Sequence, residues 1–297
     1  MKEFSIKGTG VALVTPFDKH ESVDFISLGK LIDHCIEGGV DYLVCLGTTS
    51  EYPTLSEKEI LAVREFTKDH VNGRVPLVLG MGGNNTKELT NKISKTDLSG
   101  FSAILSVAPY YNKPSQKGLY HHFRHVAGSS TLPVIIYNVP GRTGCNISAE
   151  TTLQLAEECK NIIGIKEASG NMGQCMEILG CAPKGFTVVS GEDALTMPLI
   201  ACGAKGVISV TANAFPKQVS SMVNFALKDN FKKSVTLHNS LLPFTNAIFE
   251  EGNPCGIKAA LEIMGITENV VRQPLYKISK PLYNRLQTII KDIKEIK

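Results

Sequence analysis

The 297-residue sequence predicts a (β/α)8 barrel that carries a helical C-terminal appendage. Short apolar runs recur at intervals of roughly 25 residues, and an amphipathic segment follows each run. Eight such alternations indicate parallel strands joined by crossover helices, and eight parallel strands close into a barrel of about 250 residues. The alternative is an open doubly wound sheet, which needs a glycine-rich turn after the first strand. The residues there, VTPFDKHES, do not form one.

The eight predicted strands are short runs rich in β-branched and other apolar residues. In chain order they are Gly10–Phe17, Tyr42–Gly47, Val75–Met81, Ala103–Pro109, Val134–Val139, Ile162–Ala168, Thr187–Gly191 and Val207–Val210.

Helices are predicted where apolar residues recur at helical spacing. Leu28–Glu37 carries one apolar stripe, and Ser56–His70 opens with the capping sequence SEKE. The other predicted barrel helices are Ser115–Val126, Ala149–Cys159 and Lys217–Leu227. Three further helical patterns follow without strands, at Phe231–Glu250, Pro254–Met264 and Ser279–Ile296. We therefore expect a catalytic barrel over residues 1–228 and a C-terminal helical domain over residues 229–297.

The composition is that of a globular protein and excludes several function classes. The net charge is only +3, which gives no electrostatic reason to expect a nucleic acid or a membrane as partner. No apolar run approaches the roughly 18 residues of a membrane span, and the N-terminal MKEFSIKGTGVALVTPF is too interrupted for a signal peptide. The eight cysteines form no C-x-x-C pair or zinc-site spacing. We expect reduced thiols, no metal and a cytoplasmic protein.

Lys166 is the residue that departs most clearly from the strand pattern. In a barrel of this kind the C-terminal ends of the strands supply the active site. Lys166 follows four apolar residues, where burying an ammonium is costly. A buried ion pair with Glu167 or Glu192 is one interpretation, and a desolvated amine that attacks carbonyl carbon is the other. Its place near the exit of a barrel strand favours the nucleophile.

Polar residues at the ends of other strands predict an anion site. Tyr137 lies among aliphatic residues and is either a core tyrosine or a general acid/base. Thr48 and Thr49 follow Gly47, and their N–H groups and hydroxyls either cap the next helix or form a carboxylate cradle. Arg142 is either a surface residue or a bidentate carboxylate clamp. Together these residues predict a site for an anionic keto acid.

Six segments carry a resemblance to a known family. They are GTTSE at 47–51, PYYNKPSQKGLYHHF at 109–123, YNVPGRTG at 137–144, GIKEASGN at 164–171, SGED at 190–193 and GVISVTAN at 206–213. From about Gly8 to Ala260 the sequence resembles the dihydrodipicolinate synthase family, within the superfamily of pyruvate-dependent aldolases that includes N-acetylneuraminate lyase. The segment with Arg142 is more similar to the synthase branch than to the sialic-acid lyases.

The resemblance implies a reaction and a set of roles. Lys166 would form a Schiff base with pyruvate, and the resulting enamine would attack L-aspartate 4-semialdehyde to give 4-hydroxy-tetrahydrodipicolinate, the first committed step of diaminopimelate and lysine biosynthesis. Thr48, Tyr137 and Tyr111 would form a proton relay, with Tyr111 coming from a neighbouring subunit of a homotetramer, a dimer of dimers. Arg142 would bind the carboxylate of the second substrate. The implied lining of the pyruvate pocket is Thr49, Gly191 and Ile208. The family needs no cofactor and no metal.

Regulation is the point at which the sequence departs from the family pattern. Asn84, Glu88 and Tyr110 match the positions of an L-lysine site at a dimer interface. Other positions of that pocket differ from lysine-sensitive members, which often carry small residues and histidines there; they are Tyr52, Pro53, Glu57 and Ile60. We expect weak or altered inhibition by lysine. Ser50 replaces the family's glycine after the two threonines, which removes no chemical group.

Two other functions remain open from the sequence. One is another aldolase of the superfamily, acting on N-acetylneuraminate, another sugar acid or a different aldehyde; Arg142 argues against it. The other is a catalytically silent member that binds a ligand or has a structural role. The joint presence of the reactive residues argues against a silent protein.

Overall fold

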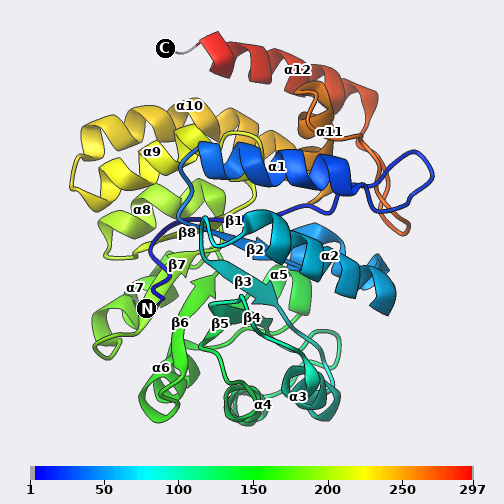
Figure 1. Cartoon of the computed structure of the whole chain (residues 1–297). Coiled ribbons are helices and arrows are strands. Elements are labelled where there is room, and N and C mark those ends of the chain that lie inside the picture. The colour runs from blue at the N-terminus through cyan, green and yellow to red at the C-terminus, as the bar shows by residue number, and fades with distance from the viewer. Residues whose placement is uncertain (1–3, 296–297) are drawn as a thin grey trace.

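The computed structural model describes residues 4–295 and contains a closed barrel of eight parallel strands in sequential order, β1 to β8. Figure 1 shows the strands at the centre with helices around them. The strands are β1 Gly8–Ala12, β2 Tyr42–Cys45, β3 Leu77–Gly80, β4 Ala103–Val107, β5 Val134–Asn138, β6 Ile162–Glu167, β7 Thr187–Ser190 and β8 Gly206–Ser209. The predicted (β/α)8 fold is confirmed.

Helices connect and cover the strands. They are α1 Phe25–Glu37, α2 Glu57–Val71, α3 Thr86–Lys95, α4 Gln116–Ser129, α5 Pro140–Thr143, α6 Ala149–Glu158, α7 Met172–Cys181, α8 Thr196–Ala201, α9 Pro216–Leu227, α10 Phe231–Glu250, α11 Cys255–Ile263 and α12 Lys280–Glu295. Short 3-10 turns follow β2, β7 and β8, and those after β2 are η1 Thr48–Ser50 and η2 Tyr52–Thr54. Among the described residues, no helix is long and apolar enough to span a membrane.

Alternation along the strands sends side chains to two separate cores. In β5, Ile135 and Tyr137 join the cluster inside the barrel, whereas Val134 and Ile136 pack in the layer between strands and helices. Successive side chains of a strand point to opposite faces, so a residue's odd or even position along the strand decides which core it enters. On β6, Lys166 pairs in register with Tyr137 and therefore shares the interior parity.

Side-chain caps start most of the longer barrel helices. At α2 the predicted capping box is present, because the Ser56 hydroxyl accepts from the Glu59 N–H and the Glu59 carboxylate accepts from the Ser56 N–H. The same kind of acceptor stands before other helices; these N-caps are Asp24, Asn85, Ser115, Ser148 and Asn171. Each satisfies an N–H that the first helical turn leaves without a partner.

The first strand is shorter than predicted. We expected Gly10–Phe17, but β1 ends at Ala12. The Val14 N–H already turns away from the neighbouring strand and donates to the Asn213 side chain at 3.3 Å. Pro16 has no N–H to give to a ladder, and Phe17 instead forms an isolated bridge with Val23.

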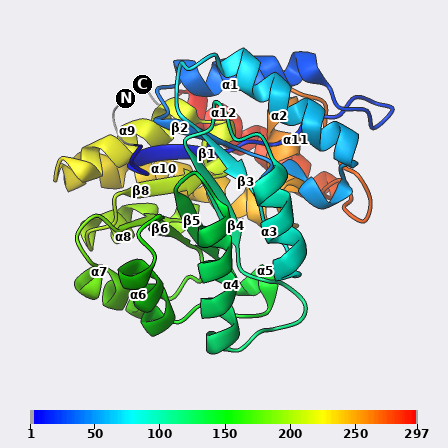
Figure 2. The same cartoon turned by 60° about the horizontal axis from the view of Figure 1, so that its bottom comes forward.

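The C-terminal helices lie on one side of the barrel. α10 packs against α9 and α12, and α11 packs against α12. The two views place α3, α4 and α6 on the side away from α12 (Figure 1, Figure 2). The expected boundary at residue 228 falls between α9 and α10. Residues 1–3 of the expected barrel domain and residues 296 and 297 of the expected helical domain lie outside the described residues. The end of the predicted helix at Ile296 lies outside them as well.

A buried ion pair joins this C-terminal segment to the barrel. Lys258 on α11 has no exposed surface, and its ammonium pairs with the Glu51 carboxylate in the turn after β2. The ammonium also donates to the Val270 carbonyl at 2.8 Å and lies 3.9 Å from the ring centre of Phe17. The Arg272 N–H donates to Glu51 at 2.9 Å. Burial lowers the pKa of Lys258, and the Glu51 charge opposes this shift.

Breaking this pair should destabilise the protein strongly. We expect Glu51→Gln or Lys258→Met alone to lower the free energy of unfolding by about 3–5 kcal/mol, because each leaves one buried charge without its partner. The double variant should lose less than the sum of the two. Denaturant unfolding of the four proteins measures this coupling. The matched control is Glu250→Gln, which breaks a half-exposed pair with Arg285 and should have a much smaller effect. Additive losses at Glu51 and Lys258 would contradict the expectation.

Candidate active site

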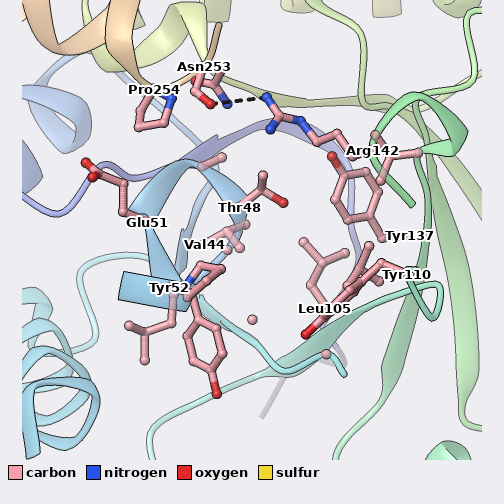
Figure 3. A pocket seen from close by; sticks show the side chains of 18 of the residues that line it. Val44, Thr48, Glu51, Tyr52, Leu105, Tyr110, Tyr137, Arg142, Asn253 and Pro254 are labelled. Atoms are coloured by element: carbon pink, nitrogen blue, oxygen red, sulfur yellow. Dashed lines mark hydrogen bonds between the residues drawn. The ribbon is translucent and has the colours of Figure 1, made fainter. Parts of the chain in front are cut away.

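A cavity of about 340 Å³ opens at the C-terminal ends of the barrel strands. Its wall is mostly apolar, formed by residues such as Val44, Leu46, Leu105, Val107 and Val139. Four of the polar residues predicted from the sequence line it together: Thr48, Tyr137, Arg142 and Lys166. Figure 3 shows Tyr137 and Arg142 on one side of the cavity, with Thr48 between them and Tyr52. An apolar cleft with a few convergent polar groups is the usual form of a small-molecule site.

Lys166 is buried inside the barrel, with only 4% of its surface exposed. Its ammonium lies 4.3 Å from the ring centre of Tyr137, the residue paired with it on β5. The electron-rich face of an aromatic ring attracts a cation, which partly offsets the loss of water. The strand register thus holds the amine against a phenol at the floor of the cavity.

The ion-pair interpretation of Lys166 is not what the geometry supports. Within residues 4–295 no salt bridge forms to its ammonium. Glu167 follows it in the strand and points to the opposite face, where its carboxylate accepts from Asn138 at 3.0 Å and Gln174 at 3.0 Å. Burial and the neighbouring Asp193 carboxyl raise the pKa of Glu192, and the Lys166 charge only opposes this shift. Lys166 is therefore a buried amine without a paired carboxylate in the described chain.

Gly191 leaves the space that the Lys166 side chain occupies. A Cβ at this position would lie 2.9 Å from Lys166 Cε and 2.7 Å from the Cβ of Ala168. Contacts of that length essentially never occur between real side chains, so any larger residue would displace the lysine. Ile208 on β8 is buried in the hydrophobic cluster inside the barrel, which also contains Tyr137.

The turn after β2 presents the two threonines. η1 begins at Thr48, whose side chain lines the cavity. Thr49 is only 2% exposed, and its hydroxyl accepts a hydrogen bond from the Asn253 side-chain amide at 3.1 Å. The Ser50 hydroxyl donates to the Gly47 carbonyl at 2.6 Å and fixes the turn.

Arg142 reaches the cavity from the short helix α5. Its guanidinium donates to the backbone carbonyl of Asn253 at 3.2 Å, the dashed contact in Figure 3. One hydrogen bond leaves several of its N–H groups free, so it can still bind a carboxylate. Between residues 4 and 295 no cluster of three or more His, Cys, Asp or Glu side chains could hold a metal ion.

Among the remaining predicted residues, Tyr110 lines the cavity and the others do not; these are Thr49, Gly191, Ile208, Tyr111, Asn84 and Glu88. Tyr111 is 89% exposed and does not line the cavity, whereas its neighbour Tyr110 does. The Asn84 amide donates to the Tyr110 carbonyl at 3.1 Å, so these two predicted regulatory residues are adjacent. Glu88 is exposed in the first turn of α3.

Sequence reasoning missed the contribution of the C-terminal segment. Asn253, Pro254, Pro274 and Leu275 line the cavity, and so does Glu51. Asn253 lies in the stretch EGNPCG, whose only local signal is that of a turn between two helices. Nothing in that signal indicates that the turn packs over the barrel and reaches Thr49, which lies more than 200 residues earlier in the sequence.

Comparisons with known proteins agree with this geometry. The model of the dihydrodipicolinate synthetase family matches residues 5–293. A 4-hydroxy-tetrahydrodipicolinate synthase of Parabacteroides distasonis is 46% identical, with 99% of both chains covered. One from Flavobacterium psychrophilum is 49% identical over 96% of this chain and 98% of its own. The structure of a chloride-inhibited dihydrodipicolinate synthase from Acinetobacter baumannii in complex with pyruvate superposes with a TM-score of 0.95 at 38% identity, covering 98% of this chain and 100% of that one.

The match covers nearly the whole chain, and the buried amine, phenol, threonine turn and arginine meet in one cavity. This chain belongs to the dihydrodipicolinate synthetase family.

Proposed function

We propose that this chain condenses pyruvate with L-aspartate 4-semialdehyde through a Schiff base on Lys166 and gives 4-hydroxy-tetrahydrodipicolinate. The observation that carries the proposal is a buried amine that no carboxylate of residues 4–295 pairs with, set against a phenol in a cavity that also presents an arginine. The names of the relatives support the same reaction. In the cell the product would enter diaminopimelate and lysine biosynthesis.

The chemistry proceeds by addition and elimination at the keto carbon. The Lys166 amine adds to the ketone of pyruvate, water leaves and an iminium forms. The iminium accepts the electrons released when a methyl proton departs, which yields an enamine. The enamine carbon attacks the aldehyde, the amino group of the second substrate adds to the imine carbon, and ring closure releases Lys166. One water molecule is lost overall.

Tyr137, Thr48 and Tyr111 are assigned to the proton transfers. Tyr137 supports this role because its phenol shares the cavity with Thr48 and its ring lies against the Lys166 amine. Tyr111 is exposed and does not line the cavity of its own chain. We therefore assign it to the site of a neighbouring subunit, within a homotetramer built as a dimer of dimers.

Binding roles follow from the position of each residue. Thr49 would hold the pyruvate carboxylate, with Gly191 and Ile208 closing the pocket around the keto acid. Arg142 would bind the carboxylate of L-aspartate 4-semialdehyde and steady Tyr137. In this assignment residues 1–228 supply the reacting groups, and residues 229–297 form a separate helical domain that covers the cavity. The eight free cysteines support a reducing, cytoplasmic location.

We also propose a regulatory site for L-lysine at Asn84, Glu88 and Tyr110, two of which are joined by the hydrogen bond from the Asn84 amide to the Tyr110 carbonyl at 3.1 Å. The Lys92 ammonium already donates to the Tyr52 hydroxyl at 2.9 Å and to the Glu57 carboxylate at 2.9 Å. The Lys92 ammonium would compete with a ligand amine for these two acceptors, so we propose that inhibition by L-lysine is weak.

Reduction by borohydride tests the proposed function directly. In the presence of pyruvate, we expect a covalent adduct that peptide mapping places on Lys166, because reduction traps the iminium. Lys258 is the internal control, since it is equally buried but pairs with Glu51 and should stay unmodified. Absence of an adduct on Lys166 would exclude the mechanism.

Removing one hydroxyl from the cavity tests the proton relay. Tyr137→Phe should lower the rate by about 10²–10⁴-fold, the usual contribution of a general acid/base group. Tyr42→Phe is the matched control, because Tyr42 is buried in the barrel interior but does not line the cavity. Initial rates with both substrates measure the effect. Nearly full activity of Tyr137→Phe would show that the relay is assigned wrongly.

A titration with L-lysine tests the altered regulatory site. We expect the initial rate to fall only at high lysine concentrations, because Lys92 occupies hydrogen-bond partners that a ligand amine would need. Half-inhibition well below the millimolar range would contradict this expectation.

A further inference from the structure

Asn253 connects the C-terminal segment to Thr49 and Arg142, the two predicted carboxylate-binding residues. It lies in the turn between α10 and α11, is 6% exposed and lines the cavity. Its side-chain amide donates to Thr49 Oγ1 at 3.1 Å, and its backbone carbonyl accepts from Arg142 at 3.2 Å. The two contacts use different parts of the residue, so a side-chain substitution removes only the one to Thr49.

The contact to Thr49 determines what its hydroxyl can do. A hydroxyl that accepts from an amide N–H keeps its own proton for a different acceptor. Within the described chain, the Thr49 hydroxyl donates to no protein group. Hydrogen bonds in such a chain polarise one another, so the amide makes the hydroxyl a better donor. Thr49 itself is buried, but its neighbour Thr48 and its partner Asn253 both line the cavity, so a carboxylate bound against this turn is the acceptor that the arrangement suits.

We infer that the Asn253 side chain is a positioning residue that orients the Thr49 hydroxyl as a donor to the carboxylate of the keto acid. It acts through Thr49 and does not touch the reacting atoms. The backbone carbonyl of the same residue independently holds Arg142, on the side of the second substrate. The inference rests on the proposed function, in which Thr49 binds the pyruvate carboxylate.

The pyruvate concentration that gives half-maximal borohydride trapping of Lys166 tests this inference without the second substrate. Asn253→Ala should raise this concentration about 3- to 10-fold, the usual range for the loss of one hydrogen bond. Asn253→Asp should raise it further. An aspartate can only accept, so the Thr49 hydroxyl would turn toward it, and a negative charge would face the keto acid. A role in packing alone predicts the reverse order, because aspartate keeps the volume of asparagine.

Steady-state kinetics provide a second measurement. The KM for pyruvate should rise in Asn253→Ala, while the KM for the aldehyde should stay nearly unchanged because Arg142 keeps its backbone partner. In a Thr49→Val background, which has no hydroxyl to orient, Asn253→Ala should have little further effect on trapping. Asn269→Ala is the matched control, since Asn269 is a buried asparagine of the same segment that does not line the cavity.

The outcomes separate the two proposals. If the wild-type protein forms no adduct with pyruvate, both fail. If the wild type is trapped and both Asn253 variants keep its half-saturating concentration, only the positioning role is wrong. The role is also wrong if Asn253→Ala raises both KM values equally or has its full effect in Thr49→Val. Asn253→Asp carries the test if Asn253→Ala does not fold.

Discussion

The buried ion pair between Glu51 and Lys258 is the constraint on which the active-site cavity depends. It joins the turn after β2, which carries Thr48 and Thr49, to helix α11 of the C-terminal segment. Two charges taken out of water are stable only when they meet each other and their remaining hydrogen-bonding partners are in place. Arg272 and the Val270 carbonyl supply those partners here. The pair ties the C-terminal segment to the turn after β2, and from the same segment Asn253 and Pro254 reach the cavity.

Lys166 is the second place where the fold accepts a buried amine, and its surroundings differ in a way that matters for chemistry. Lys258 is matched by a carboxylate, whereas Lys166 has the face of an aromatic ring beside it and an open cavity above it. The Lys258 ammonium is engaged by the Glu51 carboxylate and the Val270 carbonyl, whereas within residues 4–295 no carboxylate pairs with Lys166. This difference in surroundings distinguishes the two buried lysines and supports the proposed role of Lys166 as a nucleophile.

The side chains around the cavity come from two kinds of element, barrel strands and the turns that follow them. The strand register places Lys166 and Tyr137 in the rigid interior of the barrel, and short turns hold Thr48 and Arg142 above them. The C-terminal segment then contacts two of these turns through one residue, Asn253. The lysine and the phenol therefore lie on adjacent strands, and the threonine and the arginine lie on turns that the C-terminal segment contacts.

The sequence by itself determined the parts of this protein that follow from local periodicity. The recurrence of strands and helices predicted the barrel, the SEKE motif predicted the start of α2, and a cation in an apolar strand marked Lys166. The alternation of a strand could also have excluded Glu167 as the partner of Lys166, because neighbouring residues face opposite sides. Only the tertiary structure decided the positions of Glu51, Lys258 and Asn253, and it leaves Tyr111 exposed and outside the lining of its own cavity. The roles of Glu51, Lys258 and Asn253 depend on contacts between segments about 200 residues apart, and the local pattern of a turn carries no information about where it will pack.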